Sequence, residues 1–513
     1  MAHDFCTDKT HSRQDCSADL ASCLADLDSF VRSSAKASTS FHTFETGLFD
    51  RVLHLGHLAV GLFLALQGSG DVGAEFALPD GRTLRRLDKL HSRPLTCVFG
   101  SFTLWRTCYG SREGQKIDFV PLDSRLDLPA GKFSYLLADF NGLLETEQPF
   151  AQVAAVVQRI FKVEQHVDSL ERQAQHMAQH VEPFRDAQEA PPWQEEGTIL
   201  VQTADAKGVP MRCSADAPPI KSHAHKRGPK TGRKKQAIVG SVYSVDPLLR
   251  KPQDIVDALF RAPDADKPKK EKRPELCFKR VMARLNEYTD EHGHEHDGMA
   301  EVFAWMAEEL DGRNPLHDQV IVNLMDGDER FPQERKRHVI NGVQVDILDL
   351  LHVTPRLWKV AGLFARPDSK EAEQQVRAWL LKILRGQLKA VLRDMRAKGK
   401  EAGLSGNKKK ELNKARKYLW KRRKQMRYHE YLKAGYPIAS GVIEGACRHY
   451  VKDRMERTGM SWKQPGAQAM LGLRSVALDG TWDEFQAFYR QRECEALYPH
   501  RHLLEEISWP LAV

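Results

Sequence analysis

The 513-residue chain carries 77 Lys and Arg against 69 Asp and Glu, a formal net charge of +8, and 41% of its residues are hydrophobic. This composition is typical of globular packing rather than disorder, and the length predicts two to four domains. We expect a cytoplasmic protein, because no uninterrupted apolar stretch reaches a membrane span of about 18 residues, no signal peptide is visible, and the nine cysteines are scattered.

Positive charge is concentrated in two blocks. Residues 221–236 contain seven Lys or Arg and no acid, and residues 389–433 contain 17 basic residues against four acids. Such blocks attract a polyanion by releasing its counterions. One block alone is equally compatible with a solvated surface, but two of them in the same chain as the carboxylates described below favour nucleic acid as a partner. The candidate DNA-binding residues are Lys226, Arg227, Lys230, Arg233, Lys234, Lys235, Lys421, Arg422, Arg423, Lys424 and Lys452.

The first 190 residues form two regions. Residues 1–90 begin with a polar stretch whose start we expect to be poorly ordered, and an amphipathic helix follows over 43–66. Residues 91–190 begin with a β-rich segment over 95–120, where apolar and polar residues alternate between Gly-containing turns. We expect this second region to bind DNA ends or to dimerise.

Residues 150–184 hold a regular helical pattern. Apolar side chains recur there at alternating spacings of three and four, and no Gly or Pro interrupts 151–182. This repeat is typical of a coiled coil and predicts a dimer. A second interpretation is a helix-turn-helix with a break at 161–165 and a recognition helix starting at Asp168. A third is two ordinary helices packed on their own domain.

After a linker at Ala190–Pro192 the pattern changes to short strands. We expect strands at 198–205, 209–213, 237–245, 320–325 and 343–348, and helices at 254–260, 278–288, 299–310, 377–431, 441–457, 466–476 and 482–489. This order predicts a mixed α/β sheet and matches an RNase H-like core. The expected divisions are core segments at 195–368 and 436–495, a basic helical insertion at 369–435 and a tail at 496–513.

Three carboxylates occupy settings that metal-dependent DNA strand transfer requires. Asp205 and Asp326 end apolar strand-like runs, and Glu444 opens a basic amphipathic helix. They are separated by 121 and 118 residues, so only a fold can bring them together. Phosphodiester cleavage by two metal ions needs such a cluster, because hard cations prefer oxygen ligands and several carboxylates offset their charge.

Asp205 has a competing structural interpretation, and Asp326 has alternative metal ligands nearby. Asp205 would be a turn residue at the start of a hairpin. Asp328 and Glu329 could replace Asp326 as ligands, and Asp349 is a rival at the end of the next apolar run. Asp349 and His352 are three residues apart and would share one face of a helix, where the histidine could orient Asp349 or a substrate phosphate.

Glu444 falls in the first turn of its helix if Ser440 is the N-cap. Arg448 and Lys452 would then share its face, which suits a metal beside a phosphate backbone. The competing interpretation is a surface pair with Arg448 worth about 0.3–0.5 kcal/mol. The expected buried stripe of this helix consists of Ile443, Cys447, Tyr450 and Val451.

The segment 436–462, with Ser440-Gly-Val-Ile-Glu-Gly-Ala-Cys-Arg448 near its start, resembles the signature around the catalytic Glu of ISKra-type bacterial insertion-sequence transposases. Residues 203–210 resemble their first-aspartate motif, with Asp205-Ala206 where Asp-Gly is usual, and 324–328 resemble the second. Asp349-Leu-Leu-His352 is similar to the Cys/Asp-x-x-His element of the related Mutator-like group. The similarity runs through residues 90–495 in a consistent order.

The resemblance implies a DDE transposase with an RNase H-like core, in which Asp205, Asp326 and Glu444 hold Mg²⁺ or Mn²⁺ and carry out catalysis. Asp349, His352 and Arg448 would support them. The implied activity is to bind terminal inverted repeats, cleave DNA and join the freed 3′-hydroxyl to target DNA. The implied setting is a homodimer or higher oligomer at the bacterial nucleoid.

Three further expectations accompany this assignment. Relatives often carry a Cys-x-x-Cys zinc element, but Cys108 has no paired cysteine before Pro121, so we expect no zinc there. An RNase H-like nuclease without joining activity stays open as an alternative. So does a transposase-derived DNA-binding protein without catalysis.

Overall fold

The computed structural model describes residues 5–6, 13–111, 117–212, 233–261, 274–290, 293–367, 369–457, 459–505 and 507. The chain divides into two compact units, the first formed by Met1–Arg185 with Thr481–Val513 and the second by Asp186–Gly480. The segment after Gly480 therefore belongs to the first unit, whereas the sequence placed residues up to 495 in the catalytic core.

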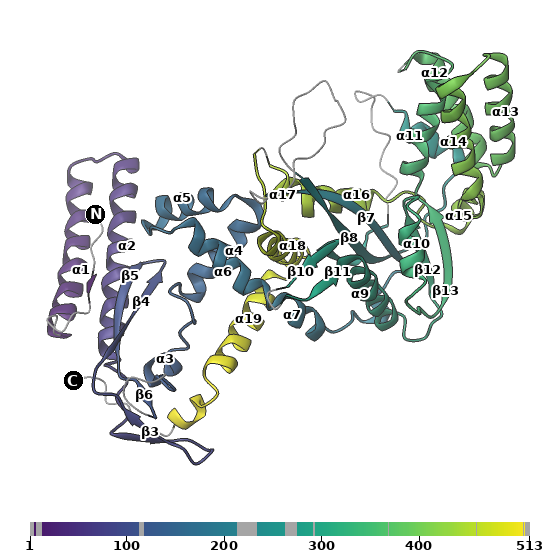
Figure 1. The fold of residues 1–513 in the computed structure, drawn as a ribbon. Helices are drawn as coiled ribbons and strands as arrows, with labels where there is room; N and C mark the ends of the chain where they lie inside the picture. The colour runs from purple at the N-terminus through teal and green to yellow at the C-terminus, as the bar shows by residue number, and fades with distance from the viewer. Residues whose placement is uncertain are drawn as a thin grey trace. The chain divides into compact units, whose positions relative to one another are not determined.

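The first unit begins with two long helices that pack against each other, α1 (Arg13–Lys36) and α2 (Phe41–Leu66) (Figure 1). The expected helix over 43–66 is confirmed as α2, whose N-cap Ser40 accepts a hydrogen bond from the Thr43 amide. The expected poorly ordered start falls mostly outside the described residues, and α1 was not expected. Within the described part, α2 is the one helix long and apolar enough to cross a membrane, a test that core helices and leader segments also pass.

The β-rich segment forms small sheets. Strands β4 (His91–Cys97) and β5 (Gly100–Arg106) pair as an antiparallel hairpin along their whole length. The two-residue β1 (Phe5–Cys6) adds in parallel to β5. A second sheet contains β2 (Glu75–Ala77), β3 (Thr83–Arg86) and β6 (Tyr109–Gly110), and the short helix α3 (Pro121–Arg125) follows. The expected β-rich region over 95–120 is therefore confirmed as far as Gly110, where β6 ends.

The expected continuous coiled coil over 150–184 is wrong. The segment forms three helices, α5 (Phe150–Phe161), α6 (Val167–Ala178) and α7 (Val181–Ala187), that pack with α4 (Tyr135–Glu147) and α19 (Trp482–Leu497). Lys162 ends α5 in a left-handed conformation with φ of 60°, which turns the chain despite the apolar repeat. Both the helix-turn-helix and the interpretation as ordinary packed helices predict a break near this point.

The second unit is built on a five-stranded mixed sheet with the order β13-β12-β7-β8-β9. Strands β7, β8 and β9 are antiparallel neighbours, whereas β7, β12 and β13 run parallel. The expected mixed α/β sheet is therefore confirmed. The strands are β7 (Ile199–Met211), β8 (Arg233–Val245), β9 (Cys277–Leu285), β12 (Val320–Met325) and β13 (Val343–Leu348).

Two predictions for this sheet are wrong. The expected helix at 278–288 is strand β9 followed by β10 (Glu287–Thr289), which pairs with β11 (Glu295–Asp297). Residues 281–285 are all buried, because helices cover β9 on both faces and its apolar side chains need not alternate. The expected strands at 198–205 and 209–213 are one strand, since β7 pairs with β8 without a break from Ile199 to Met211.

Helices cover both faces of the sheet (Figure 1). On one face, α9 (Gly298–Arg313) packs on β8 and β9 and buries Phe303 and Met306 against Leu200 and Ile321. On the other face, helices following β13 share one core with the strands. These helices are α11 (Leu350–Ala361), α12 (Lys370–Leu384), α13 (Leu388–Glu401), α14 (Gly406–Lys421) and α15 (Tyr428–Ala434). The expected insertion at 369–435 is thus helical and packs into the sheet's own core.

The chain then returns across the sheet. A helical stretch consisting of α16 (Gly441–Ala446), a π-helical turn η3 (Cys447–Lys452) and α17 (Asp453–Met455) contacts β7 and β8. Helix α18 (Gln464–Leu478) then packs on β9. Two shorter helices, α8 (Pro252–Leu259) and α10 (Arg330–Arg335), complete this unit's main elements.

Candidate active site

Three aspartates fall at one level across the parallel strands. β7 and β12 pair with a constant offset of 121 residues, as in Val320 opposite Ile199, and the same offset carried beyond the ladder relates Asp326 to Asp205. β12 and β13 pair with an offset of 23, as in Met325 opposite Leu348, which relates Asp326 to Asp349. Strands in a sheet lie about 4.8 Å apart, and residues at one level point to the same face. By alternation that face is the one covered by α11 to α16.

Asp205 and Asp326 are both half-buried, and the Asp205 carboxylate acts electrostatically on Asp326. Burial raises the pKa of the Asp326 carboxyl and the Asp205 carboxylate raises it further, whereas the Asp328 amide and His352 lower it. The Asp326 carboxylate accepts a hydrogen bond from the Asp328 amide at 2.7 Å. Asp205 accepts one from the Ala206 amide at 2.7 Å. Each carboxylate therefore has one oxygen engaged by the adjacent backbone.

Asp349, the rival of Asp326, is fully engaged by the fold. Its side chain is 1% exposed. One oxygen accepts the Ser440 hydroxyl at 2.5 Å, and the other accepts the amides of Leu351 at 2.9 Å and Ser440 at 3.3 Å. Ser440 is the residue before α16, so Asp349 fixes the start of the helix that carries Glu444. Asp349 is thus better suited to position that helix than to bind a metal.

Glu444 is exposed on α16. This helix leads directly into the π-helical turn η3, with no break in the helical backbone between them. The expected stripe of Ile443, Cys447, Tyr450 and Val451 is buried. Burial, then Asp349 and Asp205, raise the pKa of Glu444, and His352 lowers it. Because Asp205 acts on both Asp326 and Glu444, the three proposed catalytic acids belong to one electrostatic cluster. Ser440 precedes the helix as expected, but its side chain binds Asp349 instead of capping the helix.

Cys447 was expected only as a core residue, and it also contacts the site. Its thiol lies 3.6 Å from Asp205 Oδ2 and donates to that carboxylate. Burial raises the pKa of this thiol and the Asp205 carboxylate raises it further, so the group stays a neutral donor. Because Cys447 lies three residues after Glu444, it links the Glu444 helix to Asp205.

His352 and Arg448 have different positions relative to the carboxylates. His352 lies on α11, with Nε2 3.8 Å from Asp349 Oδ2, and its charge acts on both Asp326 and Glu444. Arg448 is 71% exposed and lies 3.7 Å from Asp453. The competing interpretation, a surface ion pair between Arg448 and Glu444, is therefore wrong, since the acidic neighbour of Arg448 is Asp453.

The loop after Asp326 is held by basic residues of α14. Asp328 forms a bidentate pair with Arg330, with the shortest contact at 2.7 Å, and Glu329 binds Lys421 at 2.6 Å. Arg422 donates to the Gly327 carbonyl. The two acids that could replace Asp326 are thus already paired, and Lys421 and Arg422, expected to bind DNA, contact the protein.

The remaining basic candidates lie at several places. Lys226, Arg227 and Lys230 lie outside the described residues, and of Arg233 only the backbone is described, in β8. Lys234 pairs with Glu456, and Lys235 donates to Gln464 at 2.9 Å. Arg423 lies 4.6 Å from the centre of the Trp420 ring, which is 44% exposed. Lys424 and Lys452 are exposed.

Metal binding would require the carboxylates to move closer together. Among the residues that the structure describes, no three or more His, Cys, Asp or Glu side chains form a group that could hold a metal ion as they stand. The donor set still fits a hard cation, because Asp205, Asp326 and Glu444 offer only carboxylate oxygens.

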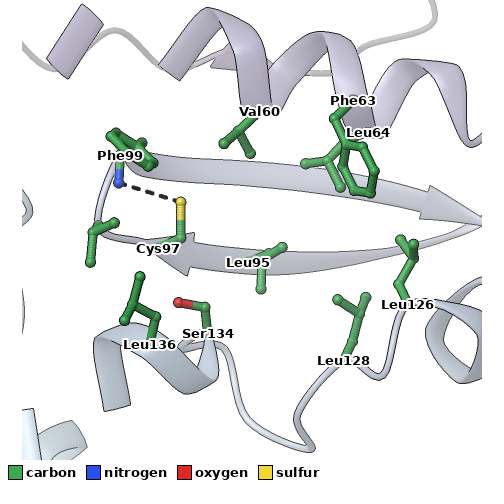
Figure 2. A pocket seen from close by; sticks show the side chains of 11 residues that line it. Val60, Phe63, Leu64, Leu95, Cys97, Phe99, Leu126, Leu128, Ser134 and Leu136 are labelled. Atoms are coloured by element: carbon green, nitrogen blue, oxygen red, sulfur yellow. Dashed lines mark hydrogen bonds between the residues drawn. The ribbon is translucent and has the colours of Figure 1, made fainter. Parts of the chain in front are cut away.

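A separate apolar pocket in the first unit offers no such chemistry. It has a volume of about 280 Å³ and lies between α2 and the β4–β5 hairpin, as Figure 2 shows. Val60, Phe63 and Leu64 line it from α2, and Cys97, whose sulfur accepts the Phe99 amide at 3.4 Å, is one of its few polar groups. No carboxylate or histidine lines it.

Comparisons with known proteins do not identify the function of this chain. No protein-family model and no curated protein matches the sequence. Among solved structures, the chain is similar to one described as "Drosophila P element transposase strand transfer complex", with 11% identity and a TM-score of 0.24. That similarity covers 72% of this chain and 86% of the other. A similarity this loose carries no argument about fold or function.

Proposed function

We propose that this protein is a DNA transposase of the DDE type, in which Asp205, Asp326 and Glu444 bind Mg²⁺ or Mn²⁺. The observation that carries the proposal is the convergence of these acids from positions 121 and 118 residues apart. Asp205, within β7, and Asp326, directly after β12, lie at one level of these adjacent parallel strands, and Asp205 raises the pKa of both other acids. Clustered acids with raised pKa values mark functional sites, because burial and like charge are retained at a cost in stability.

The strand order supports an RNase H-like core for the second unit. Three antiparallel strands in chain order, β7, β8 and β9, are followed by β12 and β13 in parallel on the other side of β7. Asp326 follows the carboxyl end of β12, and Asp205 lies beside it within β7, which continues to Met211. The carboxyl ends of parallel strands are where an open α/β sheet keeps its site. The helix that returns across β7 then brings the third acid.

The residues divide into two roles in this proposal. When bound, the metal ions would activate the attacking oxygen and stabilise the leaving oxygen of the phosphodiester. Asp205, Asp326 and Glu444 supply the ligands, and Asp349 positions the Glu444 helix through Ser440. His352 lies beside the acids and, when protonated, would supply positive charge. The region before residue 190 would recognise the inverted repeats, and two or more copies would hold the two ends.

A strand-joining assay tests this proposal. Duplexes copied from both flanks of the coding sequence, with pre-cleaved 3′-hydroxyl ends, are incubated with supercoiled plasmid and Mg²⁺ or Mn²⁺. We expect joined products with the wild type and none with Asp326→Asn or Glu444→Gln. Plasmid nicking without joining would instead indicate an RNase H-like nuclease. Binding of the duplexes with no metal-dependent product would indicate a DNA-binding protein without catalysis.

A further inference from the structure

Two arginines enclose a tyrosine beside the proposed active site. The guanidinium carbon of Arg356 lies 3.4 Å from the centre of the Tyr418 ring, and that of Arg422 lies 4.0 Å from it. Arg356 comes from α11, whereas Tyr418 and the adjoining Arg422 come from the end of α14. Cation–π contacts of this kind hold guanidinium groups in a fixed orientation.

This stack is adjacent to the loop that carries Asp326. Arg422 donates to the carbonyl of Gly327, and any side chain on Gly327 would collide with the Tyr418 hydroxyl. On α11, Arg356 follows His352 by one turn, so both side chains project toward the same side of the helix. His352 lies 3.8 Å from Asp349, beside the same cluster of carboxylates. The two guanidinium groups therefore extend the cationic side of the carboxylate cluster.

The fold leaves this positive charge poorly compensated. Among the described residues, Arg422 lies 3.7 Å from Glu329, which also binds Lys421, and it acts on Asp328, which is paired with Arg330. In the described part of the chain, no acid lies within ion-pair distance of Arg356. The Arg356 Nε atom is buried without a hydrogen-bond partner. Buried donors of this kind are costly unless an acceptor arrives from outside the protein.

We propose that Arg356 and Arg422, separated by Tyr418, form a binding site for a backbone phosphate of a DNA strand next to the cleaved bond. This inference rests on the proposed function, since it takes the strand to lie across Asp205, Asp326 and Glu444. A phosphodiester supplies acceptor oxygens for Arg356, and guanidinium groups bind phosphate with two parallel hydrogen bonds. The site orients the backbone and does not read sequence.

Binding at different salt concentrations tests this site. A duplex copied from the flank of the coding sequence is titrated with protein in Ca²⁺, at several salt concentrations, for the wild type, Arg356→Gln and Arg366→Gln. Arg366 is exposed, and its substitution removes the same charge as Arg356→Gln, so Arg366→Gln is the matched control. We expect Arg356→Gln to bind at least about tenfold more weakly, with the slope of log affinity against log salt reduced by about one. Arg366→Gln should match the wild type.

Thermal unfolding and the joining assay separate the possible failures. The proposal is overturned if Arg356→Gln keeps the wild-type affinity and salt slope. It is also overturned if Arg356→Gln lowers the melting temperature while its salt slope stays unchanged, because the stack would then only hold α14 to α11. Absence of joining by the wild type in Mg²⁺ would refute the proposed activity without affecting the result in Ca²⁺, which needs DNA binding alone.

Discussion

The carboxyl ends of β12 and β13 carry the same residue at the same level, yet their surroundings differ. Asp326 follows β12, is half-buried, and has one oxygen held by the Asp328 amide. Asp349 follows β13, is buried, and accepts hydrogen bonds on both oxygens from Ser440 and Leu351. A carboxylate with its lone pairs occupied stabilises the fold, and one with a free oxygen is available to a metal. Under the proposed function, this difference makes Asp326 the metal ligand and Asp349 the residue that positions the Glu444 helix.

The largest effect we expect comes from the β12 end. Asp326→Asn should reduce joining at least about a thousandfold, because charge stabilisation by a bound metal is worth several kcal/mol and each 1.36 kcal/mol is a factor of ten. Its free energy of unfolding should not fall, since burial already raises the pKa of Asp326. Asp328→Asn is the control and should keep activity within about fivefold, because it breaks only the exposed pair with Arg330. Equal losses in both variants would remove the distinction between the two acids.

At the β13 end, the expected loss is mainly of stability. Asp349→Asn should lower the free energy of unfolding by about 2–4 kcal/mol, because it disrupts a buried group with charge-assisted hydrogen bonds, and Ser440→Ala should cost about 1–3 kcal/mol. Urea unfolding of both single variants and the double variant measures the coupling between the two residues. If the losses in the free energy of unfolding were additive, Asp349 and Ser440 would not stabilise the fold through a direct hydrogen bond.

A smaller effect should follow from crowding the loop between these ends and α14. Gly327→Ala should cost about 1–3 kcal/mol, because the new methyl group collides with Tyr418. Displacement of the adjoining Asp326 should also slow joining by about tenfold or more. Gly441→Ala, also near the site, is the matched control because nothing lies within 4 Å of its added methyl group. A Gly327→Ala variant as stable and active as Gly441→Ala would show that Tyr418 does not pack against this loop.

The smallest effect concerns pH. The pKa values of Asp326 and Glu444 are raised, so both acids gain protons at higher pH than ordinary carboxyl groups. Metal ligands must be deprotonated, so joining should fall as the pH drops through these raised values. Stability should change in the opposite direction, because the folded state binds more protons than the unfolded state in that range. The difference in unfolding free energy between the wild type and Asp326→Asn should therefore shrink at low pH, and a constant difference would contradict the raised pKa.

Local patterns in the sequence were enough to predict much of the site. The apolar runs before Asp205 and Asp326 formed strands as expected, and the stripe containing Ile443 and Cys447 was buried. The pairing of the parallel strands could not be predicted, because no local sequence pattern near Asp205, Asp326 or Asp349 indicates which residues of β7, β12 and β13 lie opposite one another. The choice between Asp326 and Asp349 depended on Ser440, which arrives 91 residues later.

The errors have physical causes as well. The repeat through residues 150–184 continued across Lys162, whose left-handed backbone conformation no apolar pattern indicates. Residues 278–288 looked helical because β9 is covered on both faces and lacks alternation. Arg356 was missed although it follows His352 by four residues, a spacing that could have placed it on the same helix face. Its partner Tyr418 lies on another helix and could not be inferred.

Mn²⁺ binding, in the presence of a flanking-end duplex, tests the contrast between the two strand ends most directly. Titration of the wild type, Asp326→Asn and Asp349→Asn, each checked for folding by circular dichroism, shows which aspartate the metal needs. We predict that Asp326→Asn loses Mn²⁺ binding and that folded Asp349→Asn retains it. Loss of binding in Asp349→Asn together with wild-type binding in Asp326→Asn would contradict the account.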